Sequence, residues 1–343
     1  MEYHVSFPGL GLEFTVDRVA FTLFGVEVYW YGVLIALGMA IAMAFAFRQS
    51  KRFGVDSEKL ADVIMVGVVG AIVGLRGLYV LFSPYEYETF WDVINIRDGG
   101  LAIYGGIIGA VVFGALACKW RKVPILPTLD LAAMGFLIGQ CIGRWGNFTN
   151  QEVFGKNTTL PWGMLSEGTT RYLTSMQATL AERGIMVDPS APVHPTFLYE
   201  SLWCLLGFAI LYFFIKHRKY NGQIALMYVA WYGFGRAYLE SIRTDTLMWG
   251  NIRVFLALGL ATAAIATLLL IYFAVKYKGE KALEDRLYAN VTPIEENKTE
   301  GIKNNNDIDG NKCEEKTAKT TTKTPSKEKN TALTEEKEDG EAD

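Results

Sequence analysis

The sequence is poor in the residues that build metal centres, disulfide frameworks and nucleic-acid-binding surfaces. It has 3 histidines and 4 cysteines among 343 residues. The cysteines, which show neither CxxC spacing nor a short secreted framework, are Cys118, Cys141, Cys204 and Cys313. The formal net charge is −3, and the strongly basic face of a nucleic-acid-binding protein is missing. We therefore expect no metal, no cofactor, no disulfide scaffold and no nucleic-acid partner.

The first residues, MEYHVSFPGLGLEF, also lack the basic region, apolar core and cleavage site of a signal peptide.

Apolar residues, in contrast, are abundant: 51% of the residues are hydrophobic and the mean hydropathy is +0.19, which is rare for a soluble enzyme. This excess lies in the first 290 residues, because residues 291–343 contain 9 Lys and 14 Asp or Glu. Such a segment cannot bury enough apolar surface to fold, so we predict a disordered, acidic cytoplasmic tail over residues 281–343.

Seven apolar segments approach the roughly 20 residues that a helix needs to cross a bilayer core. They are residues 26–47, 60–82, 101–118, 129–147, 196–215, 223–242 and 252–275. Backbone groups in lipid must be satisfied within the segment, and alternating ten-residue strands are missing, so these segments are predicted to be helices. The predicted fold class is an all-α polytopic membrane protein with seven transmembrane helices, four in residues 26–147 and three in residues 196–280.

Basic residues of the connecting loops predict the orientation in the bilayer. They concentrate in the first, third and fifth connections and after the last span: Arg48, Lys51, Arg52, Lys59, Lys119, Arg121, Lys122, Lys216, Arg218, Lys219, Lys276, Lys278 and Lys281. Lys and Arg favour the cytoplasmic side, so an external N-terminal segment (1–25) and a cytoplasmic C-terminus are expected. Residues 148–195, which Pro and Gly interrupt, are predicted to form a small external domain. GxxxG pairs at Gly70/Gly74 and Gly105/Gly109 indicate close helix packing.

Five ionisable side chains in or at the ends of the predicted spans fall at one depth, in the outer half: Arg76, Arg144, Arg236, Glu240 and Arg243. In the sixth span, Tyr232, Arg236, Glu240 and Arg243 lie at i, i+4, i+8 and i+11. This spacing places them on one face of a helix, which should point into the bundle or a cavity. Either Arg236 and Glu240 form a structural ion pair, or they belong to a substrate site. Arg243 fits a residue that reaches the membrane interface.

The fourth span ends in the polar run GRWGNFTNQEVFG at residues 143–155. An arginine with amide donors beside it suits a phosphate group, which a guanidinium can grip with two hydrogen bonds. We therefore expect an outer-leaflet cavity for an anionic, phosphate-bearing lipid or lipid-like substrate. The alternative is an Arg144–Glu152 ion pair that closes the bundle.

This run resembles the signature of bacterial prolipoprotein diacylglyceryl transferases. Further motifs of that family agree in order: WYG at 30–32, GGLAIYGG at 99–106, HPTFLYE at 194–200 and YGFGRAYLESIRTD at 232–245. The resemblance covers roughly residues 5–280. It implies a multi-pass enzyme of the bacterial cytoplasmic membrane, with its active site outside. The enzyme would transfer diacylglyceryl from phosphatidylglycerol to the lipobox cysteine of a preprolipoprotein signal peptide, forming a thioether and releasing glycerol 1-phosphate.

The resemblance also implies roles for individual residues. Arg144 and Arg236 would hold the phosphate, with Asn147 and Tyr31 as hydrogen-bonding partners. Negative charge grows on the departing phosphate, so preorganised cations would stabilise the transition state. The residues expected to orient the arginines and to allow the external segment to turn over the site are Glu152, Glu240 and Gly155.

One position departs from the family pattern, because Tyr104 stands where a histidine is typical. A phenol with a reference pKa near 10 is a poorer base than an imidazole near 6.5. Three possibilities follow: Tyr104 only binds the lipid head group, or His194 takes the thiol proton, or the cationic pocket lowers the thiol pKa.

Three other functions fit less well. A retinal protein needs a buried lysine in its last span, and residues 252–275 contain none. A transporter needs polar groups near the midplane as well as in the outer half. A magnesium-dependent phosphotransferase needs clustered carboxylates, whereas Asp130 stands by itself at the inner end of the fourth span.

Overall fold

The computed structural model describes residues 2–83, 87, 89–95, 99–244, 248–249 and 252–289. The predicted tail beyond residue 289 lies outside these residues. The long helices are α1 (Trp30–Ser50), α2 (Ser57–Phe82), α4 (Ile103–Arg121), α5 (Ile125–Thr149), α7 (Thr196–Phe214), α8 (Gln223–Ile242) and α9 (Val254–Lys276). The short helices are α3 (Phe90–Ile94), α6 (Glu167–Glu182) and α10 (Leu283–Ala289), with 3-10 turns at Pro8–Leu10, Lys51–Phe53 and Ile215–His217.

Each predicted span corresponds to one long helix. Within the described residues, six helices are long and apolar enough to cross a membrane: α1, α2, α4, α5, α7 and α9. The chain is therefore a mostly helical, multi-pass membrane protein. Helix α8, which carries Arg236 and Glu240, is not among the six.

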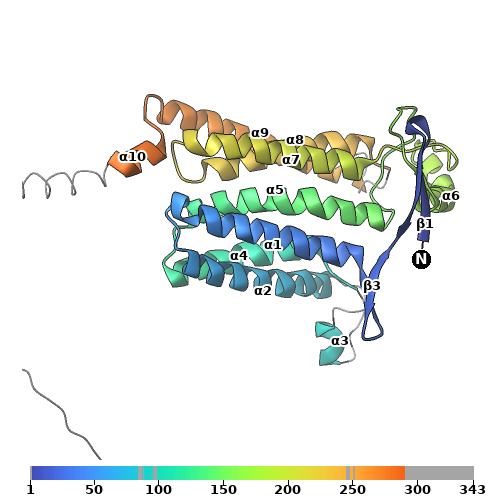
Figure 1. Ribbon diagram of the computed structural model, residues 1–343, viewed down its shortest axis with the longest axis horizontal. Helices are drawn as coiled ribbons and strands as arrows, with labels where there is room; N and C mark the ends of the chain where they lie inside the picture. The colour runs from blue at the N-terminus through green and yellow to red at the C-terminus, as the bar shows by residue number, and fades with distance from the viewer. Residues whose placement is uncertain are drawn as a thin grey trace, which may run out of the picture. The chain divides into compact units, whose positions relative to one another are not determined.

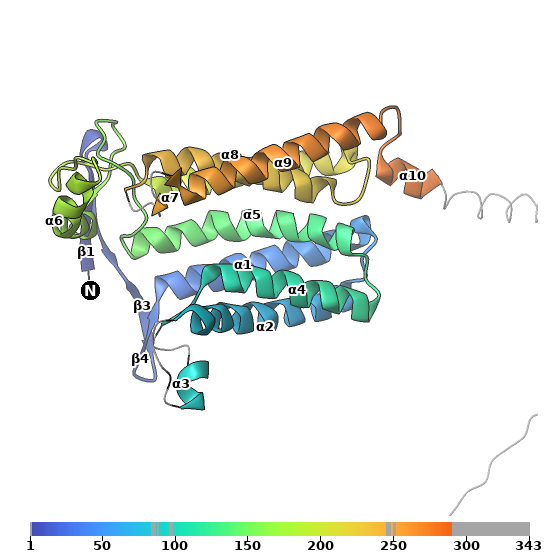
Figure 2. The same ribbon diagram turned by 180° about the vertical axis from the view of Figure 1, so that it is seen from behind.

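The long helices lie side by side in the described part of the chain (Figures 1 and 2). Helix α5 occupies the middle and contacts α1 on one side and α7 and α8 on the other. Helices α2 and α4 pair closely, as do α8 and α9. A Cβ on Gly74 would collide with the backbone of Gly105, and one on Gly109 with that of Gly70. The glycine pairs thus act in packing, as predicted.

Three small sheets show that the predicted all-α class is wrong outside the long helices. The first sheet has the order β2-β1-β5, from β1 (Glu2–Phe7), β2 (Leu12–Asp17) and β5 (Leu165–Ser166), all antiparallel. The other two are the hairpins β3 (Val19–Leu23) with β4 (Val26–Tyr29), and β6 (Met248–Trp249) with β7 (Ile252–Arg253). Residues 26–29, predicted as the start of the first span, therefore form a strand.

The physical reason for β1 is its two-residue alternation, which buries Tyr3 and Val5 and exposes Glu2 and His4. Val5 belongs to a buried cluster with side chains from residues 148–195 and the start of α7: Phe148, Phe154, Met164, Leu173, Leu180, Val187, Val193 and Phe197. The N-terminal strands and residues 148–195 therefore share one core. A short strand needs such a partner, and no local pattern in the sequence reveals it.

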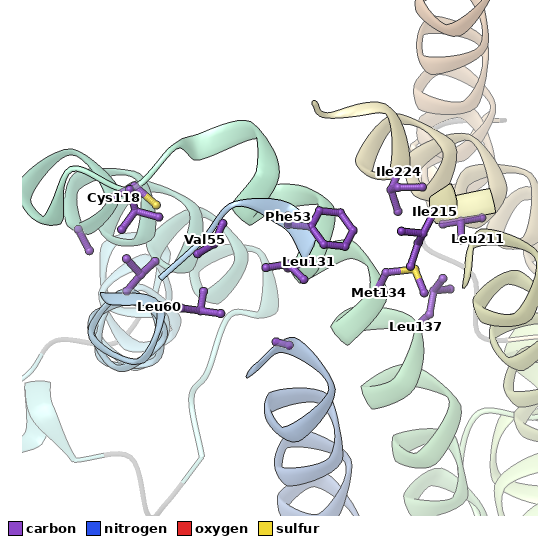
Figure 3. Close-up of a cluster of buried hydrophobic side chains, with 14 of the residues drawn as sticks. Phe53, Val55, Leu60, Cys118, Leu131, Met134, Leu137, Leu211, Ile215 and Ile224 are labelled. Carbon is purple, nitrogen blue, oxygen red and sulfur yellow. The ribbon is translucent and has the colours of Figure 1, made fainter. Parts of the chain in front are cut away.

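A second core lies at the opposite end of the long helices. Figure 3 shows Phe53 and Leu131 in this cluster, near Met134 and Ile215. Asp130 and Arg218, both fully buried, lie beside it with 3.7 Å between their charged groups. The Asp130 carboxylate also accepts hydrogen bonds of 2.8 Å from the backbone N–H groups of Gly222 and Ala225. A side chain of α5 thus caps the first turn of α8.

Helix α10 corrects the predicted start of the tail. Residues 283–289 are helical, although disorder was predicted from residue 281. Glu284 accepts two hydrogen bonds from Arg52, at 3.1 and 2.8 Å, and the Leu283 N–H donates to the Arg218 carbonyl at 2.8 Å. This short helix is held by residues more than sixty positions away in the sequence, so composition alone could not predict it.

Candidate functional site

Arg144 projects from the last turns of α5 and is held by two side chains. Its guanidinium donates to Glu200 Oε1 at 2.5 Å and to Asn147 Oδ1 at 3.2 Å. Glu200 lies in the second turn of α7 and is 2% exposed. The carboxylate that orients Arg144 is therefore Glu200, whereas the sequence predicted Glu152.

Glu152 lies near Arg144 but contacts it only through Asn147. The Asn147 amide donates to Glu152 Oε1 at 2.9 Å while its carbonyl oxygen accepts from Arg144. The amide of Asn150 donates to the same Oε1 at 3.4 Å. Glu152 thus fixes the amides next to the arginine, and the alternative of an Arg144–Glu152 ion pair is not found among the described residues.

Tyr31 in the first turn of α1 lies against the end of α5. A Cβ on Gly146 would come within 2.7 Å of the Tyr31 ring. The phenol is within electrostatic range of Glu152 and Arg144. The structure therefore brings Tyr31, Arg144, Asn147 and Glu152 together, as the sequence predicted.

Arg236 forms the second part of the site, and its predicted ion pair with Glu240 is present at 2.9 Å. Glu240 is 1% exposed, so the carboxylate is fixed inside the bundle. The Arg236 guanidinium lies 5.3 Å from the centre of the Phe255 ring, and Tyr104 stacks on the same ring at 6.1 Å. Phe255 of α9 thus links Tyr104 of α4 to Arg236 of α8.

Tyr232 precedes Arg236 by one turn on α8. Its hydroxyl is within electrostatic range of Glu200, Arg144 and Arg236. Each arginine is paired with its own buried glutamate, Arg144 with Glu200 and Arg236 with Glu240. A guanidinium fixed by a carboxylate on one edge can present its other edge to a phosphate oxygen.

Gly155 ties the segment after α5 to the end of α8. Its N–H donates to the His194 carbonyl at 2.9 Å, and the next N–H, of Lys156, donates to the Ile242 carbonyl at 2.8 Å. A Cβ at Gly155 would lie 2.8 Å from the His194 Cβ and 3.0 Å from the Ile242 oxygen. Only glycine fits without displacing these neighbours, which agrees with the close turn predicted there.

His194 precedes α7 and is partly buried. Its Nδ1 lies 3.1 Å from the Tyr199 hydroxyl, which accepts a hydrogen bond of 2.8 Å from the Trp162 indole. Burial lowers the pKa of the imidazole below its ordinary value of 6.5. The ring is therefore neutral at neutral pH, the form that can accept a proton.

Sequence reasoning missed Glu200 and Phe255. Glu200 ends the HPTFLYE motif and is a carboxylate in an apolar helix, which was the available signal. Phe255 gave no signal, because a phenylalanine in an apolar helix is ordinary. Among the residues that the structure describes, no three histidine, cysteine or carboxylate side chains are grouped to hold a metal ion.

Comparison with known proteins places the chain in a family. The model of the prolipoprotein diacylglyceryl transferase family matches residues 18–272. The phosphatidylglycerol–prolipoprotein diacylglyceryl transferase of Clostridioides difficile is 35% identical over 264 residues, 77% of this chain and 98% of that protein. That of Finegoldia magna is 38% identical over 77% of this chain and 96% of its own length. For enzyme 1 of Clostridium perfringens the identity is 41%, with coverages of 70% and 87%. The chain belongs to the prolipoprotein diacylglyceryl transferase family.

Proposed function

We propose that this chain transfers the diacylglyceryl group of phosphatidylglycerol to the lipobox cysteine of a preprolipoprotein, the first step of bacterial lipoprotein maturation. The cysteine sulfur attacks the glycerol carbon that bears the phosphate. The C–S bond of the thioether forms as the C–O bond breaks. The oxygen keeps the electron pair, so glycerol 1-phosphate leaves, and the thiol proton passes to a base. The names of the relatives and the family match support this reaction.

We place the site at the outer face of the bacterial cytoplasmic membrane. In this arrangement α8 is a seventh span, because it lies against α5, α7 and α9. The β-strands, residues 148–195 and the arginine site are outside. The basic loops, α10 and the tail are cytoplasmic, in agreement with the preference of Lys and Arg for that side. A lipobox cysteine follows a signal-peptide helix and would therefore arrive at the same level.

The observation that carries the proposal is the pair of guanidinium groups, each fixed by a buried glutamate, near Tyr232. Arg144 and Arg236 would grip the phosphate oxygens and stabilise the negative charge that grows as the C–O bond breaks. Tyr31 and Asn147 would add hydrogen bonds to the head group. Positioning of the carbon in line with the sulfur supplies much of the remaining acceleration.

We assign the thiol proton to His194. Each of the two arginines is paired with a glutamate, Glu200 or Glu240, and Glu152 lies one amide away from Arg144, so the formal charges of these five residues do not favour a thiolate. A separate base is then required, and the half-buried, neutral imidazole of His194 is suitable. Tyr104, stacked on Phe255 beside Arg236, would hold the head group.

The pH dependence of two variants tests this assignment. His194→Gln should lower the transfer rate at pH 7 by about 100-fold, the usual worth of a general base. The loss should shrink above about pH 8.5, where a free thiol ionises by itself. Tyr104→Phe should lower the rate less, by a similar factor at every pH, because only a hydrogen bond is lost. A His194→Gln defect that is independent of pH would contradict the assignment.

The function itself is tested by incubating the purified chain with phosphatidylglycerol and a lipobox peptide. Mass spectrometry should detect a peptide that gained one diacylglyceryl group through a thioether. A peptide with serine in place of the lipobox cysteine is the matched control and should stay unmodified. If a folded protein forms no thioether product from competent substrates, the proposed function is wrong.

A further inference from the structure

A third arginine is linked to the site from the opposite side of Glu152. Arg18 lies between β2 and β3, and its Nε–H donates to Asn150 Oδ1 at 3.1 Å. The Asn150 amide in turn donates to Glu152 Oε1. Neither the family match nor the sequence motifs assign a role to Arg18.

The link mirrors the one on the Arg144 side. Glu152 Oε1 accepts from the amides of both Asn147 and Asn150. The carbonyl oxygen of Asn147 accepts from Arg144, and that of Asn150 accepts from Arg18. The Glu152 carboxylate therefore orients two side-chain amides, and each amide accepts a hydrogen bond from an arginine.

The two arginines differ in what remains available for a ligand. Arg144 is bound to the buried Glu200, whereas Arg18 has no carboxylate partner among the described residues. Its guanidinium lies over the Tyr29 ring, 5.1 Å from the ring centre. Its two terminal amino groups have no acceptor in the described part of the chain. Nitrogen donors held in this way on an aromatic ring can bind an anion with little loss of side-chain entropy.

Arg18 also lines a cavity of about 400 Å³ with Glu27, Tyr29, Tyr31 and Asn150. The cavity lies at the start of α1, where the Trp30 N–H donates to the Arg18 carbonyl at 3.1 Å. This is the level at which a spanning helix meets the head groups of the bilayer. Arg18 in its lining could bind a phosphate. The carboxylate, amide and phenol oxygens of the other lining residues could accept hydrogen bonds from hydroxyl groups.

We infer that this cavity is a second binding site for a glycerol-phosphate group, next to the reaction site and contacted by Arg18. The inference rests on the proposed function, because the reaction both consumes a lipid that carries this group and releases glycerol 1-phosphate. Tyr31 lines this cavity and also lies against Gly146 at the end of α5, so the cavity is adjacent to the Arg144 part of the site. Arg18 is thus a positioning residue for the head group on its way in or for the product on its way out.

The test measures binding of glycerol 1-phosphate to the full chain in detergent by calorimetry. Arg18→Ala should weaken binding about tenfold, the worth of one charge-assisted contact. Arg18→Lys should recover part of the lost affinity, because lysine keeps the positive charge but lacks the planar set of guanidinium donors. The matched control is Arg183→Ala, an exposed arginine at the end of α6, and it should bind like the wild type. Melting temperatures should agree among the four proteins.

Kinetics with phosphatidylglycerol distinguish the two sources of the group. A raised KM for the lipid with an unchanged kcat in Arg18→Ala identifies the incoming head group. Weaker inhibition by glycerol 1-phosphate with an unchanged KM identifies the outgoing product. If Arg18→Ala matches the wild type in binding, KM and inhibition, the inference is overturned. Because binding needs no turnover, a wild type that binds in an Arg18-dependent way without transferring diacylglyceryl would refute only the proposed function.

Discussion

Arg144→Lys is expected to lower the rate of diacylglyceryl transfer by about 100- to 1,000-fold, the cost of losing a preorganised donor to a developing oxyanion. The guanidinium is fixed by Glu200 on one nitrogen and by Asn147 on another. A lysine keeps the charge but has a single ammonium group. This group cannot contact Glu200, Asn147 and a phosphate at the same time, as the planar guanidinium can. The rate is measured with phosphatidylglycerol and a lipobox peptide at saturating lipid.

A control at the other end of the bundle separates charge from geometry. Arg48→Lys, in the last turn of α1, makes the same change far from the site and should leave the rate within about twofold. Equal melting temperatures of both variants would show that folding is intact. If the rate of Arg144→Lys is within twofold of the wild type, the planar guanidinium of Arg144 is not needed for transfer, and its role in the proposed mechanism is wrong.

Asp130→Ala is expected to have the largest effect on stability. The carboxylate is fully buried, caps the first turn of α8 through two N–H groups, and faces Arg218. Its removal leaves the buried Arg218 guanidinium without its carboxylate, and breaking such a pair costs about 3–5 kcal/mol. The melting temperature in detergent should fall by at least about 6 °C.

Two further variants give this prediction its control. Asp62→Ala breaks an ion pair of 2.7 Å with Arg121 in which both side chains are about one-third exposed, so it should cost less than about 1 kcal/mol. Asp130→Ala combined with Arg218→Met should be less destabilised than Asp130→Ala alone, because no buried charge is left unpaired. A melting temperature for Asp130→Ala no lower than that of Asp62→Ala would contradict the role assigned to this pair.

The sequence alone determined the helices and the local parts of the site. The seven long helices were predicted from apolar segments of nearly membrane-spanning length, and six of them are long and apolar enough to cross a membrane. The Arg236–Glu240 pair followed from i,i+4 spacing, and Asn147 and Glu152 lie in one run with Arg144. These features depend on neighbours in sequence, so local patterns were sufficient to predict them.

The tertiary structure decided which distant residues meet. Glu200 replaces Glu152 as the partner of Arg144 because packing of α5 against α7 joins positions 56 residues apart. The strand β1 pairs along its length with β2, and residues 165–166 and a core built from residues 148–197 cover its other edge and its buried face. Phe255 and Arg18 reach the site in the same way. Such contacts depend on the relative positions and orientations of the packed helices and strands. Close packing of side chains throughout the chain sets these positions, so no short segment of the sequence specifies them.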